Sequence, residues 1–569
     1  MKRTSLFCAL LLGAHVCVSA QVSQVTDSST VQVLNEIVVT AAQIADRAPV
    51  TLQTIQSKEI SDFLSTKTYP EVLRNIGGVY STAESGSYGD AKINIRGFKQ
   101  ENFTVMLNGV PLSGFRSGSL FWNNWLGLTD ATYRIQLQKG VGGSMLAANS
   151  MGGTINILTK PAEQEVGRNL TYNITDYGLN NLRLSLHSGE MKNGWAVSFI
   201  GSRTWGDGYV DATPVDSWGY FLNVRKRLNT KHSLLFTLLG SPEKHGQRSQ
   251  KLSSEETEKY GLKYNKNWGY YNGKTNNVSA NFYHKPYLSA THFFSISDKA
   301  SLSNTLYFSI GNGGGKWTEN AGGAKITNTL NAYGQIDWDA VAASNQANGQ
   351  AFNIQSDYLA GHTWTGLKSA FDYSLSENWK LSSGLHYQYF YSWQNERITD
   401  LLGGDYWFED YEHKSLAGVA GRNPQKTVGD YIRLNNGDRD NHLSLYAQAD
   451  YISGNIHAFA GALLTTTVYQ HWDKYNYVDH FYSDRILAFG GNLKAGTSVQ
   501  TAENQNIYLN GGIYSRTPYS NVYFANNTNE ITKDVRNEQN YIVEAGYKFS
   551  TGTTKLTVNA YFNYWKNKA

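Results

Sequence analysis

Hydrophobic and polar residues alternate one by one along most of the chain after Pro161. In residues 182–187, for example, three leucines alternate with an arginine, a serine and a histidine. Successive side chains of an extended strand point to opposite faces of a sheet, so this period of two predicts strands with one apolar and one polar face. The same alternation recurs in residues 302–310, 443–450 and 556–563.

The apolar face of these strands fits two different surroundings. In a membrane barrel it meets lipid while the polar face lines the lumen, and in a soluble sandwich it meets a second sheet. The alternating segments approach the ~9–11 residues of a tilted membrane strand and exceed the ~5–6 residues typical of sandwich strands. Tyr561, Tyr564 and Trp565 stand at the end of one segment, where a membrane barrel has its aromatic girdle. Length and girdle favour the barrel, and a soluble secreted all-β binding protein is the alternative.

The connections between the alternating segments differ strongly in length. Residues 227–231 make a short turn, whereas about 242–286, 312–360 and 396–438 are long, polar and rich in aromatic residues. Outer-membrane barrels combine short periplasmic turns with long external loops. Structureless loops of this length would be unusual in a compact soluble domain. The connections therefore also favour the barrel.

Residues from about 43 to 160 have another pattern and predict a compact α/β domain. Residues 70–76 indicate a short helix that stops at Gly77 and Gly78, and residues 93–97 and 104–109 indicate strands that end at turn residues. The change of pattern near Pro161 predicts a domain boundary there.

The first twenty residues have the pattern of a secretory signal peptide. A charged start precedes a mostly apolar stretch from Ser5 to Val18, and Val18-Ser19-Ala20 supplies small residues before the expected cleavage site. The two cysteines of the chain, Cys8 and Cys17, both lie in this segment. The mature chain is therefore expected to have neither disulfides nor thiol chemistry.

Composition narrows the class of protein. Aromatic residues make up 13% of the chain, with 38 Tyr and 14 Trp, and there are 54 Gly. The mean hydropathy is −0.44, and after the N-terminus no apolar stretch approaches the ~20 residues of a spanning helix, which excludes a helical membrane protein. A net charge of +4 is small for 569 residues and gives no argument for a nucleic-acid partner.

Four segments resemble TonB-dependent outer-membrane receptors and occur in the order found in that family. The first segment, which resembles the TonB box, consists of Glu36, Ile37, Val38, Val39, Thr40 and Ala41. Residues 93–98 resemble a plug strand ending in Arg-Gly, and residues 105–111 resemble the next plug strand, with Asn108 where many members carry Asp. Residues 135–160 resemble the stretch that closes the plug. The core of the last segment, residues 152–157, is its most specific part. Residues 514–518 and 559–562 resemble recurring motifs of barrel strands.

The resemblance implies an all-β membrane barrel of 22 antiparallel strands with an N-terminal α/β plug domain in its lumen, located in the outer membrane of a Gram-negative cell. The implied organisation is a signal peptide (1–20), a periplasmic lead with the TonB box (21–42), the plug (43–160) and the barrel (161–569). Counting alternating segments after Pro161 gives about 15. We therefore expect the barrel to be incomplete at its C-terminus, as in a fragment or a split reading frame.

Two features bear on the subtype. Residues 120–128 are similar to members from Bacteroidetes, and no carboxypeptidase-regulatory-like extension precedes residues 36–41, which argues against the glycan-importing subclass. The resemblance therefore implies a receptor similar to those for siderophores and cobalamin.

The function implied by the resemblance is active import of a scarce nutrient chelate. A ferric siderophore is the leading substrate, with cobalamin, haem or an oligosaccharide as alternatives. The implied partners are the C-terminal domain of TonB, driven by an inner-membrane proton-powered complex, the chelate itself and outer-membrane lipid; no cofactor and no nucleic acid are implied. An extended segment such as residues 36–41 is suited to pairing with the sheet edge of a partner.

Candidate site residues follow from the same comparison. Ligand contacts are expected from the plug loops that face the outside, through aromatic stacking and charge-assisted hydrogen bonds. The candidates are Tyr88, Phe115, Arg116, Phe121, Trp122 and Trp125, each of which would alternatively pack between plug and barrel wall. Arg96 is expected to pair with barrel carboxylates, a structural role shared by Gly97. The glycines at 140, 142, 143, 152 and 153 (Gly152 and Gly153 above all) are expected to serve tight turns and close backbone approach.

Other chemistries lack their motifs. No GxSxG or HExxH occurs, so no enzyme is expected, and His245, His284 and His292, in or near one long loop, lack metal-ligand spacing. No complete nucleotide-binding glycine motif occurs, and residues 311–317 (GNGGGKW) indicate a loop.

Overall fold

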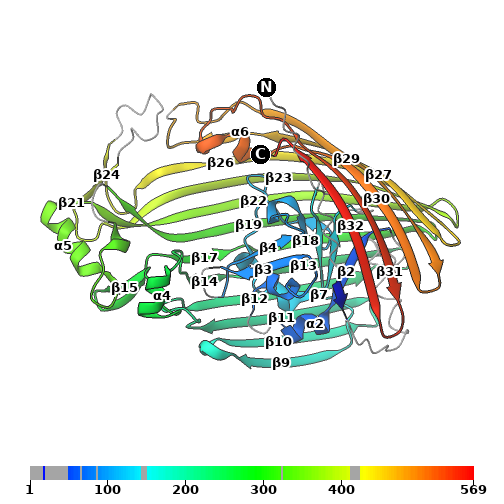
Figure 1. Ribbon diagram of the computed structural model, residues 1–569, viewed down its shortest axis with the longest axis horizontal. Coiled ribbons are helices and arrows are strands. Elements are labelled where there is room, and N and C mark those ends of the chain that lie inside the picture. Colours follow the sequence, from blue (N-terminus) through cyan, green and yellow to red (C-terminus); the bar gives the residue numbers. More distant parts are fainter. Residues whose placement is uncertain are drawn as a thin grey trace, which may run out of the picture.

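The computed structural model describes residues 17–19, 49–63, 67–84, 88–141, 150–321, 325–409, 423–477 and 479–568. Within these residues no helix combines the length and the apolar character needed to cross a membrane. Most of the chain instead forms one large antiparallel sheet that curves around a smaller N-terminal domain (Figure 1).

The large sheet has 19 strands, which comprise a three-residue strand, three short extensions and fifteen strands of 8 to 23 residues. In order of pairing the fifteen are β9 (Gly167–Ile174), β10 (Asn180–Glu190), β11 (Trp195–Gly206), β12 (Val215–Arg227), β13 (His232–Gly240), β18 (Tyr287–Ser297), β19 (Ala300–Asn320), β22 (Asn353–Ser374), β23 (Trp379–Asp400), β26 (Tyr431–Ser453), β27 (Ile456–Tyr469), β29 (Ile486–Ala502), β30 (Gln505–Arg516), β31 (Glu538–Ser550) and β32 (Lys555–Lys566). The extensions β14 (Glu243–Gly246), β17 (Ala280–His284) and β28 (His471–Asp473) continue β13, β18 and β27. The number of long strands agrees with the number of alternating segments in the sequence.

Registers join every long strand to its neighbour in the sequence, from β9 to β32. The described residues give no register between β32 and β9. Part of the edge of β32 is instead occupied by β1 (Cys17–Ser19), a stretch of the predicted signal peptide that pairs with residues 555–557.

The connections at the two ends of the sheet differ, as the sequence predicted. At one end the strands are joined by short turns such as residues 228–231 and 298–299, and at the other by long connections (Figure 1). The prediction that these long connections are structureless is wrong. Residues 247–279 contain α4 (Ser254–Tyr260), β15 (Trp268–Tyr271) and β16 (Lys274–Asn277). Residues 321–352 contain β20 (Ile336–Asp337), α5 (Trp338–Asn348) and β21 (Gln350–Ala351), and residues 401–430 contain β24 (Tyr406–Phe408) and β25 (Gln425–Lys426).

The long strands also reach further than the sequence pattern indicated. Residues 311–317, interpreted as a loop, lie within β19, which pairs with β22 up to Asn320. The reason is local packing: a Cβ added at Gly311 would lie 2.2 Å from the ring of His362, and one at Gly313 would lie 2.2 Å from the backbone oxygen of Phe282. Glycines here let neighbouring atoms approach the strand closely.

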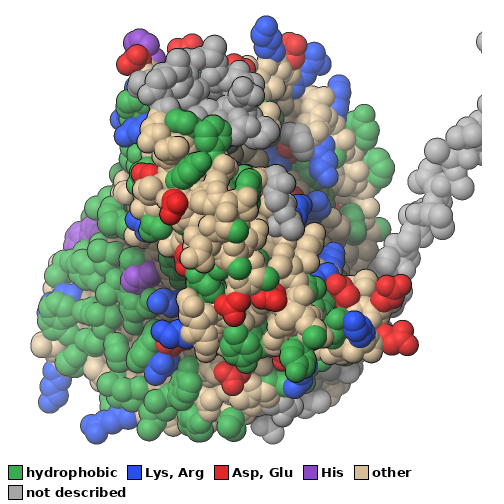
Figure 2. All heavy atoms as spheres, turned by 90° about the vertical axis from the view of Figure 1, so that its left-hand side faces the viewer, with side chains coloured by type: hydrophobic (Ala, Val, Ile, Leu, Met, Phe, Trp, Pro, Cys, Tyr) green, Lys and Arg blue, Asp and Glu red, His purple; other side chains and the backbone are tan. Residues whose placement is uncertain are grey.

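The apolar positions of the alternating segments lie on the outer face of the sheet. Exposed examples are Leu184 in β10, Leu306 in β19, Leu445 in β26 and Phe562 in β32. Figure 2, which faces the end with the long connections, shows hydrophobic side chains gathered on the flank at lower left and charged side chains scattered over the end. An outward apolar band with an inward polar surface is the pattern of a barrel that faces lipid.

One part of the girdle interpretation is wrong. Tyr561 and Tyr564 are both exposed, but the guanidinium of Arg96 lies over the ring of Tyr561, 4.4 Å from its centre, and the ring of Trp565 lies 5.8 Å from that of Phe98. The side chains of Tyr561 and Trp565 therefore contact the N-terminal domain inside the sheet. An aromatic residue at a strand end satisfies a lumen contact as readily as a lipid interface, and the sequence pattern does not separate the two.

The N-terminal domain is built on a five-stranded sheet with the order β2-β7-β8-β5-β6. Its strands are β2 (Thr51–Gln56), β7 (Thr132–Lys139), β8 (Gly153–Thr159), β5 (Thr104–Leu107) and β6 (Val110–Pro111); a second, two-stranded sheet pairs β3 (Val79–Ala83) with β4 (Ala91–Ile95), and the helices are α2 (Ser57–Phe63) and α3 (Leu128–Ala131). The helix expected over residues 70–76 is a short 3-10 helix, η2 (Tyr69–Leu73), with Pro70 in its first turn.

The core of this domain continues into the wall of the large sheet. Val105, Ile135 and Ile155 of the domain belong to one buried cluster with Tyr287 and Trp364 of strands β18 and β22. The N-terminal domain thus fills the space enclosed by the sheet, so it is a plug in the physical sense.

Candidate functional site

Residues 36–41, the segment that resembles a TonB box, lie outside the described residues, as do Gly142 and Gly143. The remaining candidate residues are described, and they fall into contacts of two kinds. One kind holds the plug against the barrel wall, and the other lies at the end of the plug below the long connections.

Arg96 follows β4 in a tight turn. Its φ is 51° and that of Gly97 is 80°, and Ile95 and Phe98 bridge across the pair. Two successive residues with positive φ match the twist of the flanking strands, and glycine adopts this backbone without strain. The turn places the guanidinium of Arg96 at the surface of the plug.

The guanidinium of Arg96 forms a buried ion pair with the barrel. Its Nη2 lies 3.1 Å from Oε1 of Glu544 in β31 and donates to Oδ1 of Asn559 in β32 at 2.9 Å. The side chains of Arg96 and Glu544 are 5% and 0% exposed. The hydroxyl of Tyr508 donates to the same carboxylate at 3.1 Å, and Thr51 also hydrogen-bonds to it. A buried charge pair is tolerated when the remaining lone pairs are satisfied in this way.

Gly140 stands directly beside this ion pair. A Cβ there would lie 2.6 Å from Oε2 of Glu544 and 2.8 Å from Nη1 of Arg96, and the residue has a φ of 71°. Gly153 has a φ of 120°, and its Cβ would lie 2.3 Å from the backbone oxygen of Gln138. Close approach therefore requires glycine at both positions.

Arg516 makes a second contact between barrel and plug, in a segment that the sequence analysis singled out only as a barrel motif. From the end of β30 it donates to the backbone oxygen of Glu101 at 2.8 Å and to Oδ1 of Asn102 at 2.8 Å. Its Nη2 also lies 2.7 Å from Glu538 of β31. This arginine thus reaches the plug from the wall, opposite in direction to Arg96.

Arg116 and Phe115 lie in the plug loop below the long connections. Nη1 of Arg116 lies 2.6 Å from Oδ2 of Asp438 in β26, and the guanidinium also hydrogen-bonds to Asn527. The ring centre of Phe115 lies 6.1 Å from that of Phe390 and 5.1 Å from that of His442. The side chain of Arg116 is 25% exposed, five times as much as that of Arg96. We call Arg116, Asp438, His471 and Asn527 the apical cluster.

The apical cluster joins three parts of the chain. The other oxygen of Asp438 lies 2.9 Å from Nδ1 of His471 in β28. The backbone of the long connection between β30 and β31 donates to the plug loop, from Ser520 to the oxygen of Phe115 at 3.0 Å and from Asn521 to that of Arg116 at 3.1 Å. Asp438, His471 and Asn527 were missed by the sequence analysis, because single polar residues inside alternating strands and loops carry no local signal.

The three other aromatic candidates of this loop region have different surroundings. Phe121 is 66% exposed. Trp122 is buried and stacks on Tyr69 at 5.3 Å, with its Nε1 donating to Gln100 at 2.7 Å. Trp125 is buried at the barrel wall, where Nζ of Lys285 lies 5.1 Å above its ring. Of these three, Phe121 alone presents its ring to solvent.

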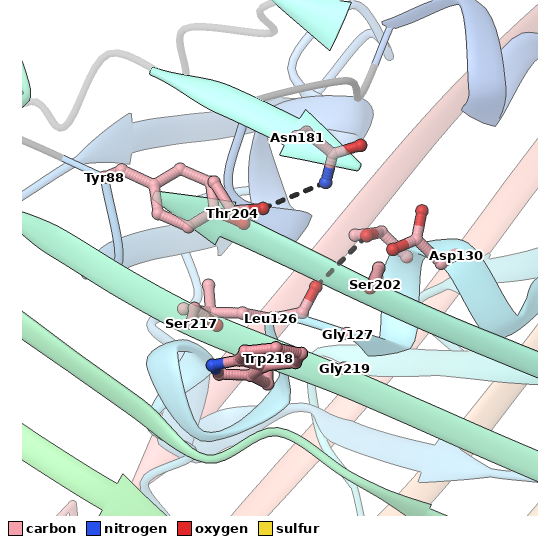
Figure 3. A pocket seen from close by; sticks show the side chains of 11 residues that line it. Tyr88, Leu126, Gly127, Asp130, Asn181, Ser202, Thr204, Ser217, Trp218 and Gly219 are labelled. Carbon is pink, nitrogen blue, oxygen red and sulfur yellow. Dashed lines mark hydrogen bonds between the residues drawn. The ribbon is translucent and has the colours of Figure 1, made fainter. Parts of the chain in front are cut away.

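Tyr88 lies between the plug and the wall formed by β10, β11 and β12 (Figure 3). The hollow beside it has a volume of about 10 Å³, about enough for one water molecule. Asn181 donates to Thr204 across it at 3.0 Å. Burial and the charge of Asp130 raise the pKa of Tyr88, so the phenol is neutral and acts as a packing and hydrogen-bonding group.

The three histidines expected in or near one loop lie on strands β14, β17 and β18 instead. His284 contacts the hydroxyl of Tyr220 at 2.9 Å, and His292 contacts His232. The residues that the structure describes contain no group of three or more His, Cys, Asp or Glu side chains suited to hold a metal ion.

His245 contributes a further plug contact. Its Nδ1 lies 2.6 Å from Glu243 and its Nε2 lies 3.0 Å from Asp90 of the plug. Lys244 and Asp216, which pair on the outer face at this level, are charged, so β14 lies beyond the apolar band. Burial alone lowers the pKa of His245, but the hydrogen bonds and charges of Asp90 and Glu243 raise it to about 10. The imidazolium is therefore held between two carboxylates.

Comparisons with known proteins agree with this architecture. Residues 45–154 match the family model described as TonB-dependent Receptor Plug Domain. The chain is 30% identical over 202 residues to the vitamin B12 transporter BtuB of Photobacterium profundum (34% of this chain, 31% of the relative). It is 24% identical over 282 residues to the ferric enterobactin receptor of Pseudomonas aeruginosa (46% of this chain, 37% of the relative). The chain thus matches about a third of the length of these curated relatives.

Solved structures share the fold. The unliganded ferric citrate transporter FecA superposes with a TM-score of 0.68 at 13% identity, over 92% of this chain and 71% of that one. The copper transporter OprC gives a TM-score of 0.64 at 12% identity, over 92% and 74%. These proteins are transport receptors rather than enzymes. With a plug domain matched in sequence, a barrel wall matched in fold and an arginine of the plug paired with a barrel glutamate, the chain is similar to the TonB-dependent receptors of the outer membrane.

Proposed function

We propose that this protein binds a scarce nutrient chelate at its outer end and imports it with energy delivered by TonB. The observation that carries the proposal is the plug itself, held inside the sheet by buried polar contacts and presenting a partly exposed arginine and aromatic rings below the long connections. A passive pore has no use for such a domain.

The proposed ligand site is the apical cluster together with Phe115 and Phe121. A guanidinium offers charge-assisted hydrogen bonds to carboxylate, catecholate or phosphate oxygens of a chelate, and exposed rings offer stacking. Asp440 adds to the polar character of the site, since neither oxygen of its buried carboxylate has a hydrogen-bond partner among the described side chains. Tyr88, Trp122 and Trp125 are less suited, because each is packed in the plug or against the wall.

A ferric siderophore is the leading substrate, and cobalamin is the second candidate. The similarity to a ferric enterobactin receptor supports the first and the 30% identity to a vitamin B12 transporter supports the second. Growth of a deletion strain on single iron, haem or cobalamin sources separates the two. Loss of growth on a ferric siderophore alone supports the first, and loss on cobalamin alone supports the second.

Coupling to TonB is assigned to residues 36–41. The substitution Val38→Pro removes a backbone donor from the segment that would pair with the partner's sheet edge. We expect uptake to fall to the level of the deletion strain while surface binding of the ligand persists. The matched control is Val33→Pro, which makes the same change in the polar lead outside the segment. Equal uptake by the wild type and Val38→Pro would contradict this assignment.

A further inference from the structure

A hollow of about 220 Å³ lies in the barrel wall where β26, β27 and β29 run side by side. Five residues line it: Arg439, Asn441, Val468, Gln470 and Arg485. None of them takes part in the plug contacts or in the proposed ligand site. The hollow therefore belongs to neither.

All five side chains face outward. In β26 the buried Asp440 lies on the lumen side, so Arg439 and Asn441, one residue to either side, lie on the outer face. The registers place Asn441 opposite Val468 and Val468 opposite Leu487. The backbone N–H of Arg439 donates to the backbone oxygen of Gln470 at 2.7 Å. Arg439 therefore lies beside Gln470, one outward row closer to the long connections than Asn441 and Val468.

The surface directly below the hollow is apolar. The next outward row pairs Leu443 with Thr466 and Thr466 with Phe489, and Phe489 is 65% exposed. Leu445 and Leu464 are exposed one row further down. The two arginines thus stand at the border between the apolar band, which faces lipid chains, and the polar rim, where lipid head groups lie.

The guanidinium groups of Arg439 and Arg485 lie without a carboxylate partner among the described residues. No ion pair joins either guanidinium to a described carboxylate, whereas Arg203, on the distant strand β11, has its Nε 3.0 Å from Asp216. Two guanidinium groups around one hollow attract an anion. Arginine in particular matches the fork of oxygens on a phosphate.

We propose that this hollow binds the phosphorylated head group of a membrane lipid, with Arg439 and Arg485 taking the phosphate oxygens and the acyl chains lying on Leu443, Leu487 and Phe489. The occupant is a lipid rather than a free anion, because the apolar row continues directly below the cationic one. The inference rests on the outer-membrane location and is independent of the proposed transport.

The test compares lipids that differ in head group. The full chain is purified in dodecyl maltoside micelles doped with dioleoyl phosphatidic acid or with dioleoyl phosphatidylcholine, and retained lipid is counted by native mass spectrometry. We expect the wild type to retain phosphatidic acid in clear preference to phosphatidylcholine. The variant combining Arg439→Gln and Arg485→Gln is expected to retain it about tenfold less, since charge-assisted hydrogen bonds to phosphate are lost. Both side chains are exposed, so the variant is expected to fold, which heat-modifiable migration in gels verifies.

The control removes two other outward cations of the rim, by Arg203→Gln with Lys244→Gln, and should leave retention unchanged. Equal retention by the wild type and the double-arginine variant overturns the site. Equal loss in the control shows a general charge effect and overturns it too. If millimolar inorganic phosphate displaces phosphatidic acid fully, the hollow is a free-anion site and the assignment to lipid is wrong.

Discussion

Arg96 and Arg116 both extend from the plug to a carboxylate of the barrel. The two contacts differ in exposure, which distinguishes a residue that holds the plug in the barrel from one that is proposed to bind the ligand. Arg96 is almost fully buried, and its partner Glu544 is surrounded by further hydrogen-bond donors. Arg116 is a quarter exposed, and its contacts reach a long connection that lies at the open end. The first pair is fully satisfied by the protein, whereas the second has room for a partner from solution. The same residue type thus serves a structural role in one place and a proposed ligand role in the other.

The largest effect is expected from breaking the buried pair. Glu544→Gln leaves the guanidinium of Arg96 buried without its counter-charge, which costs about 3–5 kcal/mol. We expect hydrogen exchange of the amides in β7 and β8 to accelerate accordingly in the purified protein. The control Glu190→Gln removes the partner of Arg227 from an exposed pair and should cost less than about 1 kcal/mol. Similar costs for the two variants would refute the contrast between buried and exposed pairs.

The buried contact of His245 with Asp90 and Glu243 is a second structural contact of the plug, and its stability is expected to depend on pH. The pKa of His245 is raised from 6.5 to about 10, so its contribution to stability is fully present below about pH 6.5 and is lost as the pH rises through about 10. We expect plug stability to fall as the pH rises from about 6.5 to about 10, and the fall to be smaller in His245→Gln. The variant should be less stable than the wild type by roughly 1.5–3 kcal/mol at neutral pH. Parallel pH curves for the two proteins would show that His245 is not the titrating group.

Substitution of Arg116, the more exposed of the two arginines, should change ligand affinity more than the stability of the protein. Arg116→Gln is expected to weaken ligand binding about tenfold while lowering stability less than Glu544→Gln does, because the guanidinium is partly solvated and the buried Asp438 keeps its contact with His471. Binding to whole cells and urea unfolding of the purified protein measure the two quantities separately. A large loss of stability with unchanged binding would reverse the roles assigned to Arg96 and Arg116.

The smallest effect is expected at Phe121. Its ring is 66% exposed, so Phe121→Ser should change the free energy of unfolding by less than about 0.5 kcal/mol. A drop in ligand affinity without a drop in stability would assign the ring to the ligand site. No change in either quantity would remove Phe121 from the proposed site and leave the cluster around Arg116.

The sequence by itself determined the elements and their faces. Alternation after Pro161 defined the long strands, and the side that is apolar in the sequence is the exposed outer face, because period two leaves no freedom about which residues share a face. The turns at Arg96-Gly97 and Asn108-Gly109 were also legible, since glycine and asparagine are the residue types that adopt positive φ most readily. Sequence reasoning further indicated that Arg96 would meet a carboxylate of the barrel.

Only the tertiary structure decided which residues meet. Glu544 lies 448 positions from Arg96, and Asp438 lies 322 positions from Arg116. Such contacts depend on the curvature of the sheet and on the rotation of the plug inside it, and neither leaves a local periodic signal. The same reason explains why Trp122 and Phe121, adjacent aromatic residues with equal claims in the sequence, lie in the core and in solvent respectively. Alternation fixes the face of a side chain, and packing in three dimensions fixes its partner.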